Sequence, residues 1–491
     1  MKEKSRKSRR ARGRLALAFV VLIPLMFASV PRTGAASSVN NSAARVMEPG
    51  GLPAQLQRSR APIDAPGQQP GGLSAEGVRQ ITALITEKQR RTPAQQKIDS
   101  QLLQAVRESR GEPMAPGVNL EPADVRANEA GRLLVDIDAA VSDPLIVRIE
   151  ALGGEMIYPS FRYNTIRARV DLSAVEAIAA MPEVKFIKPA ERSMTSGTPG
   201  GGALGAGSTF AERAANVREG MRNFLANRAA GGGFTGSVDS EGDRDHRADD
   251  ARNTYGYSGF GIKVGVLSDS FNSTGGAPAD VLSGNLPGPG NPLGNLTPVT
   301  VVQDLGPNQG TDEGRAMLQI VHDLAPKAQL FFATADISEA GFATNITNLQ
   351  SVSHCDIIID DVFYFDEPVF EDGIVAQAVD TVTAAGALYF SSAGNEGSLA
   401  KSTAGVFEGD FNDSGSPAFT FPGGSKMGTI HNFGTVATPV NGDIITAVGE
   451  AYTLNWADAQ GHASDDYDLF LVTSSGTVKR ASTNIQNGTQ N

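Results

Sequence analysis

The sequence predicts an α/β protein whose core is a doubly wound parallel sheet, and three observations lead to this fold class. Between residues 251 and 400, apolar strands alternate with helices. These strands are apolar almost throughout, which is typical of a parallel sheet covered by helices on both faces. Polar residues able to carry chemistry come directly after several strands, at the sheet edge where such proteins bind ligands.

The composition fits a soluble globular protein. The chain has 491 residues, 40% of them hydrophobic and 20% charged, a length that suits about three domains. The net charge of −12 argues against nucleic acid as the main partner. The single cysteine, Cys355, excludes an internal disulfide and a cysteine-rich metal site. It lies in an apolar run, so we interpret it as a buried structural thiol.

Residues 1–36 have the layout of a secretory signal. The first 14 residues include eight Lys or Arg, an apolar stretch runs from Leu15 to Val30, and small residues follow at Gly34-Ala35-Ala36. The apolar core is short for a membrane span, which needs about 20 residues, and Pro24 interrupts it. We therefore expect an extracellular or periplasmic protein that meets the membrane through this segment alone. An uncleaved anchor is the less favoured alternative.

The next two segments differ in pattern. Residues 37–129 are rich in Gln, Pro, Ala and Arg, so we expect a low-complexity, solvated and partly disordered leader with helical stretches in 73–110. Residues 130–192 read as β-α-β-β-α-β, the order of the ferredoxin-like motif.

Residues 193–250 are rich in Gly and Ser and then charged, which predicts a linker where cleavage could occur. A dense run of metal-ligating side chains lies near its end, at Asp243, Asp245, His246, Asp249 and Asp250. A solvated charge cluster is the favoured interpretation, and a metal site is the alternative.

Within residues 251–400 we expect strands at 262–267, 299–303, 328–333, 356–362 and 387–392. The expected helices are 313–324, 338–351 and 371–385. After residue 400 the helical pattern stops. Short strands at a spacing of about ten residues predict a β-sandwich-like segment over 401–491, interpreted as an incomplete insertion.

Three blocks of this core carry a family resemblance. The strand that begins at Gly261 ends on Asp269. The block Gly310-Thr-Asp-Glu-Gly opens a helix that runs to Ala325-Pro326. A later strand ends in Ser391-Ser-Ala-Gly-Asn-Glu-Gly397. Over about residues 130–400 this pattern resembles the subtilisin-like serine proteases, the subtilases.

The resemblance implies roles for individual residues. Asp269 stands where the family has the acid of its catalytic triad. Asn395 stands where the family has the side chain that completes the oxyanion hole. Ser392, Ala393 and Gly394 fall on the substrate-binding part of the same block.

One departure concerns the catalytic base. Aligned back from Ala325-Pro326, Glu313 stands where the family has His, as in the sedolisins, acid-acting relatives that use Glu as the base. The sedolisins also have an Asp four residues later, where this chain has Met317. A carboxyl pair of Glu313 with Asp269 would raise one pKa and share a proton. His322 lies two and a half helical turns further on and is interpreted as structural.

Two further departures stay open. The family's nucleophile block, Gly-Thr-Ser-x-x-x-Pro, is absent after residue 397. We expect the serine beyond Asn491, and the rival account is a true terminus and an inactive protease. Where the family usually has Asn-x-Ser, this chain has Asp360-Asp361. These acids could favour basic substrates, bind a cation or add to the carboxyl cluster.

The resemblance thus implies a secreted endopeptidase made as a proenzyme, with the ferredoxin-like segment as its propeptide. Its partners would be peptide or protein substrates and its own propeptide. No cofactor is certain, and structural calcium is left open. A second hypothesis is a catalytically inactive secreted binding module on a subtilase scaffold. A third is a different hydrolase on a doubly wound sheet, although no Gly-x-Ser-x-Gly elbow supports an esterase.

Overall fold

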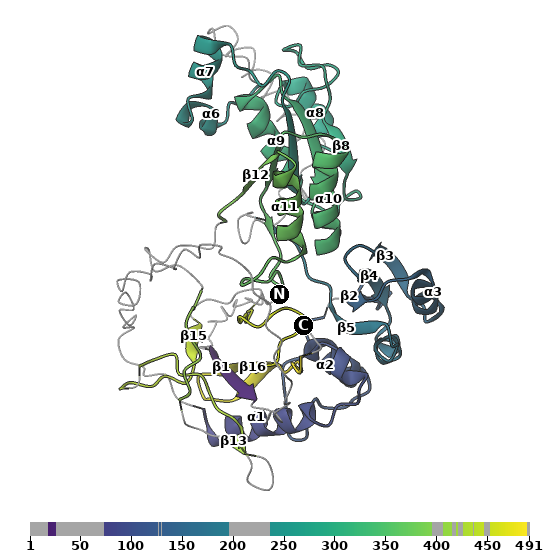
Figure 1. The fold of residues 1–491 in the computed structure, drawn as a ribbon, viewed down its shortest axis with the longest axis vertical. Coiled ribbons are helices and arrows are strands. Elements are labelled where there is room, and N and C mark those ends of the chain that lie inside the picture. Colours follow the sequence, from purple (N-terminus) through teal and green to yellow (C-terminus); the bar gives the residue numbers. More distant parts are fainter. Residues whose placement is uncertain are drawn as a thin grey trace, which may run out of the picture.

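The computed structural model describes residues 18–25, 73–125, 127–128, 130–195, 236–394, 406–414, 419–420, 426–435, 437–445 and 452–488. Most of the predicted signal segment, the start of the leader and the middle of the predicted linker lie outside these residues. Across the described parts of the chain, no helix is both long and apolar enough to span a bilayer. The α/β core lies at one end of the molecule's long axis, and the leader helices lie with the C-terminal sheet at the other (Figure 1).

The predicted parallel sheet is present in the core. Its strands lie in the order β12-β10-β7-β9-β8, and every neighbouring pair is parallel. The strands are β7 (Lys263–Ser268), β8 (Thr300–Gln303), β9 (Gln329–Thr334), β10 (Ile357–Asp360) and β12 (Leu388–Ser391). The helices are α8 (Ala277–Ser283), α9 (Glu313–Leu324), α10 (Glu339–Ser351) and α11 (Ile374–Ala384).

Both faces of the central strands β7, β9 and β10 are covered, which explains why these strands are apolar at successive positions, whereas the edge strands β8 and β12 are largely exposed. Phe332 on β9 faces α9 and packs in one cluster with Leu318. Its neighbour Phe331 faces the other side and packs with Phe342 of α10. Successive strand residues point to opposite faces, so an apolar run needs a helical layer on each.

The N-terminal α/β segment follows the expected order of strands and helices. It contains β2 (Leu133–Ala139), α3 (Asp143–Ala151), β3 (Glu155–Ser160), β4 (Thr165–Val170), α4 (Val175–Ala179) and β5 (Val184–Pro189). Its sheet is antiparallel in the order β3-β4-β2-β5. Residues 133–189 are called the βαββαβ domain below.

The described part of the leader is packed, which differs from the solvated leader expected from its composition. It forms α1 (Ala75–Lys88), a 3-10 turn η2 (Gln95–Lys97) and α2 (Ser100–Ser109). Ser74 and Asp99 cap the two α-helices by accepting backbone N–H bonds. The inner face is fully buried, as Ile81, Leu84 and Leu102 show. Enough apolar residues lie on one helical face to offset the entropy of ordering.

Residues after 400 contribute short strands, as predicted, but the described layers differ from two stacked sheets. The strands are β13 (Phe419–Thr420), β14 (Lys426–Gly428), β15 (Asp443–Ile445), β16 (Asp466–Thr473) and β17 (Val478–Ser482). An antiparallel sheet in the order β15-β1-β16-β17 includes β1 (Ala18–Leu25), from the predicted signal core. Helices α1 and α2 pack against this sheet, and the β-sandwich stays a prediction.

The charged end of the predicted linker is helical rather than extended. It forms α6 (Glu241–Asp245) and α7 (Ala248–Tyr255). Asp243, expected in a solvated cluster, is buried and its Oδ1 lies 2.6 Å from Nη1 of Arg252. The Ser240 N–H donates to Oδ2 of Asp323 on α9, 2.8 Å away. The solvated interpretation is therefore wrong for Asp243, because a cation from the neighbouring helix balances its charge.

Two other expectations concern metal and thiol chemistry. Within the described ranges, no group of three or more His, Cys, Asp or Glu side chains is placed to hold a metal ion. Cys355 is a buried free thiol, as expected. Burial raises its pKa to about 12, so it stays protonated and unreactive at neutral pH.

Candidate active site

The candidate site lies at the carboxyl edge of the parallel sheet, where three neighbouring strands end. Asp360 on β10 stands opposite Leu267 on β7 and opposite Ser391 on β12. The residues that follow these strands, Asp269, Asp361 and Ser392, therefore belong to one edge. The strand order β12-β10-β7 is what brings them together.

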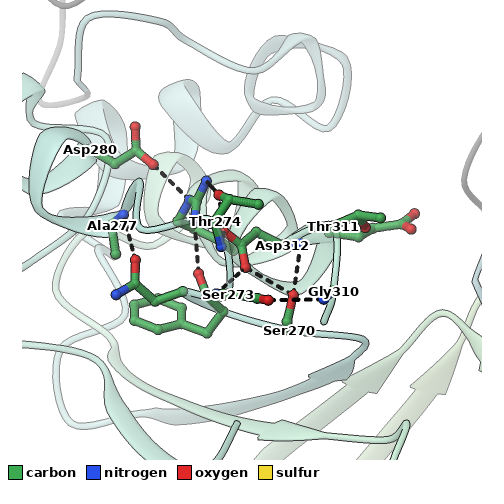
Figure 2. A network of polar contacts seen from close by, with 12 residues as sticks. Ser270, Ser273, Thr274, Ala277, Asp280, Gly310, Thr311 and Asp312 are labelled. Atoms are coloured by element: carbon green, nitrogen blue, oxygen red, sulfur yellow. Dashed lines mark hydrogen bonds and ion pairs between the residues drawn. The ribbon is translucent and has the colours of Figure 1, made fainter. Parts of the chain in front are cut away.

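A buried carboxylate, Asp312, fixes the loop that leads into α9 (Figure 2). It adopts a left-handed backbone conformation with φ of 64°. Its side chain accepts hydrogen bonds from Ser270 Oγ at 2.9 Å, Ser273 N at 2.6 Å and Thr274 N at 3.0 Å, and it pairs with Arg315. Burial opposes ionisation, but these bonds and the Arg315 charge lower the pKa of Asp312. The loop and the helix start are therefore held as one unit.

Asp269 forms a second link between β7 and α9. Its carboxylate is buried, and Oδ1 accepts the backbone N–H of Glu313 at 3.0 Å. Oδ2 accepts from the hydroxyl of Thr311 at 2.7 Å and from the Thr311 N–H. An anion that accepts N–H groups at a helix start is stabilised by the helix dipole. Asp269 thus positions Glu313 through its backbone.

The side chain of Glu313 meets a different carboxyl from the expected one. The sequence pointed to Asp269 as its proton partner, but the carboxyl whose pKa Glu313 raises is that of Asp361. Asp361 is 7% exposed, so its carboxyl is largely removed from water. Burial raises the pKa of Asp361 to about 7, and repulsion from Glu313 adds to this increase.

The interaction of Asp361 with Glu313 bears on the three roles that the sequence left open for Asp360-Asp361. A buried acid facing Glu313 fits the carboxyl cluster better than a contact with a basic substrate or a cation. Asp360, its neighbour, has a separate task. It accepts from Ser391 Oγ at 2.7 Å and from Val362 N at 3.3 Å, which joins the end of β12 to the chain beyond β10.

The block with the most specific resemblance is described in part. Ser392, Ala393 and Gly394 follow β12 and are exposed at the site edge. The N–H of Ser392 donates to the carbonyl of Asp360 at 3.1 Å, which continues the strand pairing. Asn395 lies outside the described residues, so its predicted oxyanion role stays a prediction.

A segment of the chain itself lies in the site. Strand β6 (Met194–Thr195) pairs antiparallel with β11 (Val362–Phe363), and Thr195 stands opposite Val362. The hydroxyl of Thr195 donates to Oε2 of Glu313. Sequence reasoning placed these residues at the domain–linker boundary and missed the contact, because a strand of two residues has no periodic pattern.

The βαββαβ domain also contacts the core through polar side chains beside the site. Lys188 Nζ lies 2.6 Å from Asp366 Oδ2, and Tyr158 donates to Thr344 Oγ1 at 3.0 Å. Ser193, just beyond the domain, donates to Asp336, which follows β9. These contacts hold the domain so that its C-terminal end reaches Glu313.

His322 takes no part in the described site. Its side chain is fully buried, and Nε2 lies 3.4 Å from the amide nitrogen of Asn295. Burial lowers the pKa of His322 to about 4, so the ring is neutral at physiological pH. This environment agrees with the structural role expected from its helical position.

Comparisons with known proteins add structural neighbours. No family model matches the sequence, and no curated protein matches it. One neighbour is fervidolysin of Fervidobacterium pennivorans, a keratinolytic enzyme related to subtilisin, with 10% sequence identity and a TM-score of 0.29. The match covers 56% of this chain and 41% of the fervidolysin chain. Another is the epidermin leader peptide processing serine protease of Staphylococcus aureus, with 10% sequence identity and a TM-score of 0.27. This match covers 54% of this chain and 60% of the protease chain.

This chain therefore spans less than two thirds of either neighbour. A TM-score below 0.5 does not establish a common fold, so we infer function from this chain's own residues.

Proposed function

We propose that this protein is a subtilase-like serine endopeptidase, exported and made as a proenzyme, with the βαββαβ domain as its propeptide. The supporting observation is the pairing of β6 with β11, which brings Thr195 to Glu313. Addition of an extended peptide to an exposed strand is a general mode of peptide recognition. Met194-Thr195 would occupy β11 as a bound peptide does, next to an ionisable group able to act as a base.

In the proposed mechanism, Glu313 removes the proton of the attacking hydroxyl. Before attack, Glu313 and Asp361 share one proton, with Asp361 as the protonated member. The hydroxyl oxygen then bonds to the peptide carbonyl carbon, and its proton passes to Glu313. The pair returns one proton to the leaving amine when the peptide bond breaks, and water hydrolyses the resulting ester. Asp269 holds Glu313 in place, and Asn395 donates to the oxyanion.

The proposal requires a nucleophilic serine from outside these 491 residues, since the sequence holds no Gly-Thr-Ser-x-x-x-Pro block. It also predicts acid-favoured hydrolysis, because the shared proton is lost when both carboxyls ionise. With the pKa of Asp361 at about 7, the rate of the mature enzyme should fall as pH rises through neutrality.

The alternative is a catalytically inactive binding module on the same scaffold. The absent His at the start of α9 favours it. In that case β11 would bind extended peptides without cutting them, and Thr195 would occupy the peptide site until displaced.

Hydrolysis of an unstructured protein by the native full-length product separates these two functions. We expect Glu313→Gln to lower the rate by a factor on the order of 10²–10⁴, the usual contribution of a positioned base. Glu408→Gln, which changes an exposed acid outside the site, is the matched control and should keep the wild-type rate. An unchanged rate and pH profile in Glu313→Gln would refute the proposed base. Peptide binding without turnover in the wild type would favour the binding module.

Export is the remaining element of the proposal. Its support is the basic, apolar and small-residue order of residues 1–36. The N-terminus of the exported protein should lie after Ala36, and an exported chain that retains Ala18–Leu25 would contradict signal cleavage there.

A further inference from the structure

The leader helices α1 and α2 dock on strands β16 and β17, almost 400 residues away in the sequence. We call this contact the leader–sheet interface. Its apolar part is continuous with the core of the βαββαβ domain, and Leu84, Leu103, Phe470 and Val478 belong to one buried cluster. Figure 1 shows α1 and α2 beside β16, at the opposite end of the molecule from α9. The leader therefore joins the βαββαβ domain and the C-terminal sheet in one hydrophobic core.

A buried ion pair lies at the centre of this interface. The side chain of Lys88 is 2% exposed, and its ammonium group contacts Asp466 and lies 2.7 Å from Oδ1 of Asp468. Asp466 is also 2% exposed, and Asp468 is fully buried. A buried ammonium with two carboxylates is stable only while the three groups stay together, since loss of one partner leaves charge unpaired in a dry environment.

The leader also covers the outer edge of β17, the end strand of its sheet among the described residues. Gln80 accepts the N–H of Val478 at 2.7 Å, and Gln101 donates to the carbonyl of Ala481 at 2.8 Å. Ser100 accepts the N–H of Thr483 at 3.0 Å.

Arg91 continues this cover, because its guanidinium donates to the carbonyl and the hydroxyl of Thr483, each at 2.8 Å. An uncovered strand edge is an aggregation hazard, so this sheet needs the leader.

The contact between the βαββαβ domain and the catalytic core has a different character. Its hydrogen bonds come from polar side chains such as Tyr158, Arg167 and Lys188. Polar interfaces of this kind are typical of contacts that open, whereas apolar interfaces with buried ion pairs are typical of permanent ones.

We propose that the leader–sheet interface keeps the N-terminal fragment bound after the chain is cut between Thr195 and Gly236. The cleaved propeptide then stays as a resident inhibitor, tethered through its leader at a high effective concentration. Its C-terminal end can leave Glu313 and return without dissociation of the fragment. This inference takes the inhibitory role from the proposed function, but the tether itself does not depend on catalysis.

The test uses the exported protein that begins after Ala36, because Ala18–Leu25 of the uncut chain pairs with β16 and would itself hold the fragments together. It carries Glu313→Gln, to suppress self-cleavage, and a recognition sequence for an exogenous protease inserted within residues 196–235. After cutting, both fragments should elute as one complex at high dilution. Lys88→Met should speed dissociation at least tenfold, whereas Lys185→Met, at an exposed site on the βαββαβ domain, should not. Separation of the wild-type fragments, or equal dissociation of Lys88→Met and Lys185→Met, would overturn the proposal.

Hydrogen exchange of the cut protein without the Lys88 change covers the case in which Lys88→Met does not fold. The amides of Val478 and Thr483 donate to leader side chains and should stay protected after the cut. Exchange of these amides at the rate of free peptides would overturn the tether. Absence of hydrolysis by the wild-type protein, together with protection of both amides in the cut protein, would refute the peptidase and leave the tether standing.

Discussion

The carboxyl pair at the site gives the sharpest quantitative prediction, through Asp361→Asn. Asp361 carries a pKa raised from its ordinary value of 3.8 to about 7, first by burial and then by Glu313. A carboxyl whose pKa is raised by folding stabilises the protein while it is protonated. That stabilisation is complete below the unfolded value and is lost as pH rises through the folded value. An asparagine stays neutral, so the variant should not suffer this loss.

The magnitude follows from the size of the pKa increase. At about 1.4 kcal/mol for each tenfold change in proton affinity, the increase corresponds to about 4 kcal/mol in the free energy of unfolding. The wild type should lose up to this amount relative to Asp361→Asn between about pH 4 and about pH 8. At the acid end the two proteins should be similar, because a protonated acid and an amide can each donate to Glu313.

Native-state hydrogen exchange of the central strands is the suitable assay, because it reports on the core alone in a chain of several units. The amides of β7 and β10 should show the pH-dependent difference between wild type and Asp361→Asn. Asp372→Asn, which removes an exposed carboxyl before α11, is the control and should follow the wild type. Profiles for Asp361→Asn and wild type that stay parallel within about 0.5 kcal/mol would refute the shared-proton argument.

Two other predictions concern docking and helix position. Burial and the charge of Asp366 raise the pKa of Glu339 to about 8, although Lys188 acts in the opposite direction. Docking of the βαββαβ domain should therefore weaken as pH rises through that value, because Glu339 then becomes charged. Exchange at β11 measures this, and a pH response that Glu339→Gln leaves unchanged would contradict it. Gly314→Ala would place a Cβ 2.3 Å from the ring of Phe332 and should destabilise the core by about 1–3 kcal/mol while reducing activity. Wild-type stability and rate in this variant would show that α9 has room to move.

The sequence allowed the core to be predicted closely, because its signals are local. Helix α9 begins and ends where the apolar spacing of Met317, Leu318 and Val321 places it. The strands around Phe331 and Ile358 are continuous apolar runs that need two covered faces. Local patterns of this kind reflect the immediate geometry of a helix or strand.

Other features depend on contacts that no local pattern contains. Lys88 lies on a helix whose polar composition suggested solvent, and its burial requires two aspartates from β16. The helix containing Asp243 is docked through Arg252, a pairing between two helices. Such placements follow from tertiary packing rather than from residue order.

The candidate site contains residues of both kinds, those placed by a local pattern and those placed by tertiary packing. Asp269 accepts the backbone N–H of Glu313 at the start of α9, and the catalytic roles that the resemblance implied for both residues stay predictions. The contact between Glu313 and Asp361 depends on β10 lying next to β7, which alternation of strands and helices does not determine. The acidic pair Asp360-Asp361 was the available sequence signal for this contact, but the partner of these acids could be identified only from the strand order of the sheet.

The position at which the native full-length product is cut tests the central claim most directly. If Met194-Thr195 lies in the site as a bound peptide, intact mass and N-terminal sequencing should place the cut directly after Thr195, with Glu313→Gln left uncut. A cut at a distant position, or the same cut in Glu313→Gln, would show that this edge of the sheet is not the peptidase site.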